Sequence, residues 1–332
     1  MRTKRLTFHA FPSLAAALTL SVLLAVPSMA QQPQPGPKTV LVASGTVTGL
    51  YYPVAGALCR QMNQERPRHG LRCLVEATDG PVQNLAALRS GDVDLALIQS
   101  DWQAVAVRGE GRFSGTGPFK ELRAVATLHA ETITLLVRPE AEIDDLSKLK
   151  GKRVNLGPRG SALRNLSDLV IGAAGVRLPD DADMAPDVAL AALCAGQLDA
   201  AFFAVGHPNA SVMQATVQCG AVPLAVAGPG IDKLLSQRPD LTPADIPANL
   251  YPGVQEAVSS IGVAATLVTR ADVPDETIRE VVRVLLEERS ELVEQHPVFN
   301  GLTRDTMADR ARTAPPHPAA AAAFAATGPI QR

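Results

Sequence analysis

Polar side chains that could bind a small ligand follow three successive apolar runs near the start of the chain. Hydroxyl and amide groups, together with free N–H groups at a helix start, bind carboxylates and similar anions. An ordinary loop, in which the tyrosines only pack, is the alternative interpretation. In chain order the polar residues are Ser44, Thr46, Tyr51 and Tyr52, then Thr78 and Asp79, then Gln99, Ser100 and Asp101.

The elements that must position these side chains alternate between strand and helix. We expect strands over 39–43, 71–78 and 94–101, and helices over 54–65 and from Pro81 to Gly91. This alternation is typical of an α/β doubly wound parallel sheet, which binds ligands at the carboxyl ends of its strands. The polar residues should therefore meet at one edge of the sheet.

The strand–loop–helix pattern restarts after about Ile133, which indicates a second α/β lobe. Two long β-rich runs, 122–138 (interrupted at 129–131) and 259–269, bracket this middle region, and 229–252 is expected to be helical. Two crossovers of this kind suit a hinged receptor with a ligand cleft between its lobes. The predicted organisation is lobe I over 39–132 plus 252–332 and lobe II over 133–251.

The N-terminus is expected to direct export to the periplasm. Residues 1–30 combine a basic start, an apolar run and a small-residue cleavage site at Ala30, which is typical of a cleaved signal peptide. Residues 31–38 form a Pro/Gln linker. The net charge of −2 becomes more negative once this peptide is removed, and no basic patch indicates a nucleic-acid partner. No later run is long enough to span a membrane.

The four cysteines occur as two local pairs. In an oxidising compartment they predict disulfides Cys59–Cys73 and Cys194–Cys219, although three connectivities are formally possible. The spacing does not fit a metal site, because Cys-x-x-Cys and close histidine pairs are absent from the sequence. We therefore expect no metal and no other cofactor.

Motifs of the common enzyme classes are also absent from the sequence. Gly-x-Ser-x-Gly, His-Glu-x-x-His and a P-loop do not occur. Ser44, Asp101 and His207 could form a triad only with a geometry that the sequence does not supply. The chain is therefore predicted not to be an enzyme.

The remaining ligand candidates lie on further loops and helix starts. Arg159 and Arg164 flank a glycine-rich turn, where a guanidinium could hold a carboxylate or simply be solvated. Glu131 could bridge the lobes or hold an ammonium group, and Asp101 could bind an amine or cap a helix. The full candidate set is Ser44, Thr46, Tyr51, Tyr52, Gln83, Asn84, Gln99, Ser100, Asp101, Glu131, Arg159, Ser161, Arg164 and His207.

Several motifs in order resemble one family. The stretches SGTVTGLYYPVAGALC (44–59), LKGKRVNLG (149–157), CAGQLDAAFFAVGHPN (194–209) and APPHPAAAAAFAATG (314–328), with Gln83-Asn84 and 99–101, are similar to TAXI-type solute-binding proteins of tripartite ATP-independent periplasmic (TRAP) transporters. The resemblance covers essentially the whole mature chain. Two departures concern the ligand loops: Gly80-Pro81 replaces Gly-Ser, and Gly160-Ser161-Ala162 replaces Gly-Ser-Gly.

The resemblance implies a type II periplasmic-binding-protein fold and a transport function. A monomeric receptor would capture a small organic anion, a dicarboxylate or an acidic amino acid such as glutamate or 2-oxoglutarate, and deliver it to a TRAP-type membrane permease. The alternative is an exported sensor that presents the bound solute to a membrane signalling receptor. The two functions share a fold and differ in the membrane partner.

Overall fold

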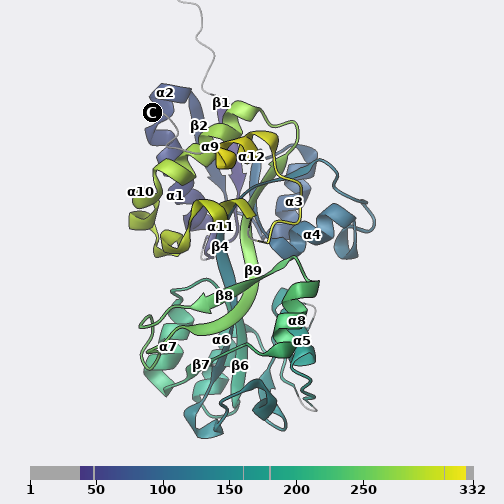
Figure 1. Ribbon diagram of the computed structural model, residues 1–332, viewed down its shortest axis with the longest axis vertical. Helices are drawn as coiled ribbons and strands as arrows, with labels where there is room; N and C mark the ends of the chain where they lie inside the picture. The colour runs from purple at the N-terminus through teal and green to yellow at the C-terminus, as the bar shows by residue number, and fades with distance from the viewer. Residues whose placement is uncertain (1–37, 48, 160, 179–180, 310, 327–332) are drawn as a thin grey trace, which may run out of the picture. The chain divides into compact units, whose positions relative to one another are not determined.

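The computed structural model (Figure 1) describes residues 38–47, 49–159, 161–178, 181–309 and 311–326. The predicted signal peptide and residues 31–37 of the predicted linker lie outside this part of the chain. The described strands are β1 Lys38–Ala43, β2 Leu71–Glu76, β3 Leu95–Gln99, β4 Leu122–Val137, β5 Val154–Asn155, β6 Ala200–Val205, β7 Val222–Leu224, β8 Leu241–Ile246 and β9 Val258–Arg270.

Helices connect and cover these strands. The α-helices are α1 Tyr51–Gln64, α2 Arg66–His69, α3 Pro81–Ser90, α4 Ser100–Arg108, α5 Ala162–Ala173, α6 Pro186–Cys194, α7 Ala210–Cys219, α8 Pro229–Gln237, α9 Asp275–Glu287, α10 Arg289–Gln295, α11 Arg304–Asp309 and α12 Pro318–Ala325. The 3₁₀ helices are η1 Gly111–Phe113, η2 Pro139–Ala141, η3 Leu146–Leu149 and η4 Pro297–Gly301.

The strands form one mixed sheet in the order β2-β1-β3-β9-β4-β6-β5, in which β7 also pairs with β4 and β8 with β9. β1 runs parallel to β2 and β3, with Val40 opposite Cys73 and Val42 opposite Leu95. This arrangement confirms the predicted parallel sheet of the first strands and brings their carboxyl ends to one edge. β9 runs antiparallel to β3 and to β4.

The long strands β4 and β9 join two groups of elements (Figure 1). β4 pairs with β9 over 122–132 and then with β6 over 132–137. Hydrophobic clusters lie on both sides of the sheet in each group. In one group of elements, Val42, Leu97 and Ile278 belong to one cluster, and Ile98, Phe113 and Val268 belong to the other. In the other group, Leu135, Val170 and Phe202 belong to one cluster, and Leu193, Phe203 and Tyr251 belong to the other.

The molecule therefore has a mixed α/β architecture in which two packed regions share β4 and β9. The lobe boundaries 39–132, 133–251 and 252–332 stay a prediction.

Gly262 allows the two shared strands to approach closely. It lies opposite Thr132, and a Cβ atom there would lie 2.2 Å from the backbone oxygen of Glu131. That contact is far inside van der Waals distance, so a side chain at this position would push β9 away from β4. The hydroxyl of Ser260 also donates a 2.5 Å hydrogen bond to the backbone oxygen of Ile133.

Two expectations about local structure were wrong. β4 is continuous through 129–131, and its register shifts occur just before, between Ala124 and Ala126 and between Thr127 and His129. The expected helical region 229–252 contains only α8 and then the strand β8. β8 alternates buried and exposed residues, and it tolerates Pro243 because it pairs with β9 alone, as an edge strand.

Strand boundaries also shift at the ends. The run 94–101 is a strand only to Gln99, because Ser100 and Asp101 already form the first turn of α4. Lys38, assigned to the linker, is the first residue of β1.

Both disulfides have the predicted local pairing. Cys59 of α1 bonds to Cys73 of β2 with 4.9 Å between their Cα atoms, and Cys194 bonds to Cys219 with 5.1 Å. The first fixes α1 to the sheet, and the second joins the ends of α6 and α7. Each closes a loop for which the chain-entropy treatment gives about 3 kcal/mol of stabilisation.

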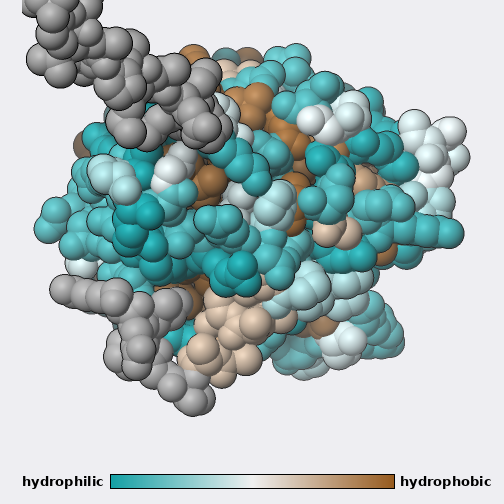
Figure 2. All heavy atoms as spheres, turned by 90° about the horizontal axis from the view of Figure 1, so that it is seen from above, coloured by the Kyte–Doolittle hydropathy of each residue, from teal (hydrophilic) through white to brown (hydrophobic). Residues whose placement is uncertain are grey.

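The surface is mainly hydrophilic on the face in Figure 2, with smaller hydrophobic areas between polar side chains. Within the described residues, no helix is long and apolar enough to cross a bilayer.

Candidate functional site

The carboxyl ends of β1, β2 and β3 are tied together by the buried side chain of Asn84. Its Nδ2 group donates to the backbone oxygens of Ser44 at 2.6 Å and Leu97 at 2.8 Å, and its Oδ1 accepts from the Thr78 hydroxyl at 2.6 Å. The Ser44 hydroxyl donates to the Glu76 backbone oxygen at 2.7 Å. Asn84 and Ser44 are fully buried, so both candidates position the loops in this structure.

Ser100 is likewise buried, and its hydroxyl both donates and accepts a hydrogen bond within the protein. Its hydroxyl donates to the Asp240 backbone oxygen at 2.6 Å and accepts from the Ala264 N–H at 2.9 Å. It therefore fastens the start of α4 to β9 and to the residue that precedes β8. Asp101, the next residue, is half-buried, and its Oδ1 accepts from the Trp102 N–H at 2.8 Å.

Tyr51, Gln99 and Glu131 form a polar cluster beside these strand ends. The Gln99 Nε2 group donates to Glu131 Oε2 at 3.0 Å, and the Tyr51 hydroxyl lies near the same carboxylate. Burial raises the pKa of Glu131, although the Gln99 amide donates to it and the Tyr51 hydroxyl lies nearby. Burial, followed by the charge of Glu131, raises the pKa of Tyr51. We call these three residues the acceptor cluster.

The acceptor cluster contains polar atoms whose bonding capacity is unused. Tyr51 is 8% exposed, and neither its hydroxyl nor Gln99 Oε1 has a hydrogen-bond partner of good geometry among the described residues. Buried polar groups are normally paired, and an unpaired one costs about 1 to 3 kcal/mol. Such groups beside strand ends are therefore candidates for contact with a ligand.

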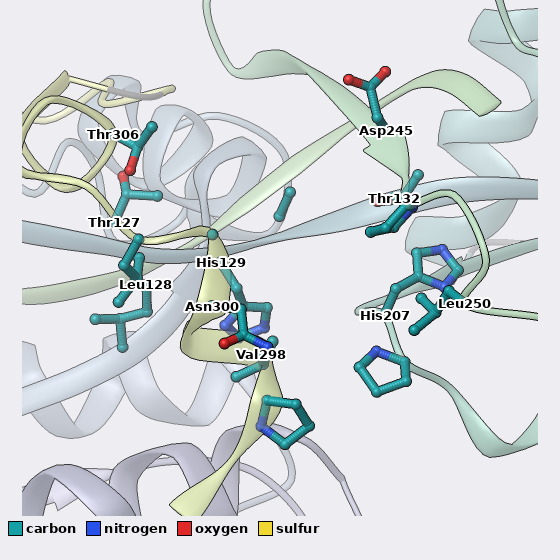
Figure 3. A pocket seen from close by; sticks show the side chains of 16 residues that line it. Thr127, Leu128, His129, Thr132, His207, Asp245, Leu250, Val298, Asn300 and Thr306 are labelled. Carbon is teal, nitrogen blue, oxygen red and sulfur yellow. The ribbon is translucent and has the colours of Figure 1, made fainter. Parts of the chain in front are cut away.

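His129 connects the acceptor cluster to a cavity of about 360 Å³ (Figure 3). Its ring packs edge-on against Tyr51 with 6.0 Å between the ring centres, and it also lines the cavity. Burial lowers the pKa of His129 to about 3, so its ring is neutral at pH 7. Other lining residues come from β4, β8, η4, α11 and the loops that follow β6 and β8, and include Thr127, Thr132, His207, Asp245, Leu250, Val298, Asn300 and Thr306.

His207, one of the candidate ligand residues, lies in the cavity wall. Its Nε2 is 3.0 Å from the Thr134 hydroxyl, and its Nδ1 is 2.6 Å from the Tyr251 hydroxyl. Burial lowers the pKa of His207 to about 4. Both ring nitrogens are engaged, so this neutral ring shapes the wall.

The two candidate arginines are paired with aspartates of their own region. Arg164 lies 3.0 Å from Asp168 and 2.5 Å from Asp181, and the exposed Arg159 lies 3.3 Å from Asp183. The Ser161 hydroxyl accepts from the Arg164 N–H at 3.1 Å and so caps α5. This geometry explains all three side chains without a ligand.

The remaining candidates are exposed around the same strand ends. Thr46 and Tyr52 lie at the start of α1, and the Gln83 side chain accepts from the Asp79 N–H at 2.8 Å at the start of α3. The structure thus brings Tyr51, Gln99 and Glu131 together and leaves Gln83 and Tyr52 at the surface.

Sequence reasoning missed His129 and Tyr251. His129 precedes Glu131 by two residues, and the two-residue period of a strand places both side chains on one face. The expected interruption of the strand at 129–131 removed this two-residue period from the prediction. Tyr251, which holds His207, lies in a region that was expected to be helical and gave no comparable signal.

Comparison with known proteins identifies the family. The profile of the NMT1-like family matches residues 42–328. A TctC solute-binding protein from Polaromonas is 17% identical, with 81% of this chain and 89% of that chain covered and a TM-score of 0.53. This likeness shows that the two proteins share a fold.

Two further structures are more distant. The periplasmic aliphatic sulphonate-binding protein SsuA from Escherichia coli is 16% identical, with 80% of each chain covered and a TM-score of 0.49. MatC from Rhodopseudomonas palustris, solved with bound malate, is 20% identical, with 79% of this chain and 88% of that chain covered and a TM-score of 0.49. The chain has the two-lobed fold of periplasmic binding proteins, and it belongs to the NMT1-like family.

Proposed function

We propose that the chain is an exported receptor for a small organic solute, which it captures between two lobes and delivers to a TRAP-type membrane permease. The observation that supports this most directly is the acceptor cluster, whose buried polar atoms lack partners beside the cavity at β4. A protein that needed this region only for stability would gain from pairing those atoms or replacing them with apolar groups.

The fold and the comparisons support a receptor over an enzyme. Structural neighbours with this fold include a TctC solute-binding protein and a sulphonate-binding protein. The disulfides are consistent with an oxidising compartment such as the periplasm. The motifs shared with TAXI-type proteins favour a TRAP-type permease as the partner.

The proposed solute carries at least one carboxylate, as in a dicarboxylate or an acidic amino acid. The helices α1, α3 and α4 start at the strand ends, and none of their N-cap residues makes a capping side-chain hydrogen bond, although Asp101 accepts from the Trp102 N–H within α4. Their free N–H groups and positive dipole ends favour an anion at this edge of the sheet. Malate, with which MatC was solved, is a dicarboxylate.

A thermal-shift screen of the purified mature protein tests this function. Dicarboxylates, keto acids and amino acids are added singly at 1 mM, with sodium chloride at matched ionic strength as the control. A solute with a Kd of about 1 µM stabilises the folded state by about 4 kcal/mol and raises Tm by about 10 °C. The proposal fails if no acidic solute raises Tm.

Uptake measurements test the partner. The receptor and the candidate permease are reconstituted in proteoliposomes, and radiolabelled solute should accumulate only when both are present. Accumulation without the receptor would contradict the proposed delivery.

A further inference from the structure

The unpaired atoms of the acceptor cluster define what a ligand must offer. The Gln99 amide points its NH₂ group at Glu131, because its oxygen would be repelled by the carboxylate. The unpartnered atom is therefore Oε1, which can only accept a hydrogen bond. Glu131 also keeps acceptor capacity, since Gln99 is the one donor of good geometry to it among the described residues. The cluster therefore has more acceptor sites than donors, because the Gln99 NH₂ group and the Tyr51 O–H are its only side-chain donors.

The charges around the acceptor cluster are negative. Asp101 lies close enough to Glu131 for the two carboxylates to affect each other, and Asp240 is close to Asp101. The nearby cation Arg238 is held by Asp240, with 2.5 Å between Nη2 and Oδ2. His129, on the other side, is neutral at pH 7. A second carboxylate of a ligand would be repelled here, whereas a cation would be attracted.

The Tyr51 hydroxyl is a separate indication that this is a ligand site. It is more than nine-tenths buried, it faces the Glu131 carboxylate, and it has no partner of good geometry in the described part of the chain. A hydroxyl in this position can donate to Glu131 and still accept from a third group. Tyr51, Gln99 and Glu131 thus bring oxygen atoms from α1, β3 and β4 close to one another.

We propose that Tyr51, Gln99 and Glu131 form an ammonium subsite, so that the solute is an amino acid whose protonated amine binds there. This inference rests on the proposed receptor function and narrows its substrate class. A primary ammonium supplies three donors and one positive charge, which match the three acceptors and compensate the half-buried carboxylate of Glu131. A keto acid of the same length supplies neither donors nor charge, so Glu131 discriminates against it.

Water is the competing occupant of this subsite. It also donates hydrogen bonds, but it does not neutralise Glu131. The two possibilities differ in a measurable way, because a water-filled subsite would not select between an amine and a ketone.

Matched ligand pairs test the proposal by isothermal titration calorimetry. Each pair differs only in the α-amino or α-keto group: L-glutamate with 2-oxoglutarate, L-alanine with pyruvate, and L-leucine with 4-methyl-2-oxopentanoate. We expect the amino acid of at least one pair to bind the wild-type protein about 100-fold more tightly than its keto partner.

Three variants locate the effect. Glu131→Gln should weaken amino acid binding by about 30-fold and reduce the preference over the keto acid, and Tyr51→Phe should weaken it by about 5-fold. Glu294→Gln changes an exposed carboxylate on α10 and should bind as the wild type does. Far-UV circular dichroism and Tm confirm that each variant folds.

The outcomes separate the subsite from the receptor function. If a keto acid binds as tightly as its amino partner, or Glu131→Gln leaves the preference intact, the ammonium subsite is wrong and the receptor function stands. If no member of any pair binds and the wider carboxylate screen is also negative, both proposals fall. An amino acid preference that Glu131→Gln removes supports both.

Discussion

Asn84 provides a sharp test of how the strand ends are held, because the sequence placed it among the ligand contacts. The structure buries it completely and gives it hydrogen bonds to Ser44, Leu97 and Thr78. Asn84→Ala breaks all three and leaves two backbone oxygens and a hydroxyl unpaired. At about 1 kcal/mol for each lost bond, with a further cost for the unpaired groups, the variant should lose about 4 kcal/mol of unfolding free energy.

Urea unfolding measures this loss through the fluorescence of Trp102, the single tryptophan of the chain. Trp102 lies in α4 with its ring 6.1 Å from that of Phe113, so its emission should change when this region unfolds. The matched control is Gln83→Ala, the adjacent amide, which is exposed and should cost less than about 1 kcal/mol. If Asn84→Ala unfolds like the wild type but no longer binds the solute, Asn84 is a ligand contact and the reasoning is refuted.

Three further changes test other parts of the structure. Replacing Cys59 and Cys73 together with alanine should cost about 3 kcal/mol, and free thiols at these positions in exported protein would contradict the disulfide. Burial raises the pKa of Asp101 from 3.8 to about 6, so the folded protein binds a proton that the unfolded chain releases, and stability falls as pH rises from 4 to 6. In urea unfolding, Asp101→Asn should remove up to about 3 kcal/mol of this pH dependence. An unchanged pH dependence would contradict the shift. Gly262→Ala should lower stability by about 2 kcal/mol, and an unchanged Tm would refute the close β4–β9 approach.

Much of the fold was accessible from the sequence because it depends on local patterns. The alternation of apolar runs and helical segments predicted the parallel arrangement of β1, β2 and β3, and the local cysteine pairs predicted both disulfides. β8 was missed because an edge strand with a proline in it resembles a loop or helix start. Its identity as a strand depends on its antiparallel pairing with β9, the next strand in the chain, and the residue types of β8 do not reveal this pairing.

The site was less accessible, because residue type does not reveal which hydrogen bonds are already made. Asn84 and Ser100 are polar residues at strand ends, as Gln99 is, yet internal partners use the first two. Arg164 had the right chemistry for a carboxylate, but Asp168 and Asp181 occupy it. Only the spatial arrangement distinguishes a side chain that positions a loop from one with capacity left for a ligand.

The most direct test of the receptor function is a calorimetric titration of the mature protein with the solute that raises its Tm most. We predict one solute per chain, with a Kd of about 1 µM, and binding weakened by Glu131→Gln but not by Glu294→Gln. A protein that binds no small carboxylate or amino acid under these conditions would contradict the account.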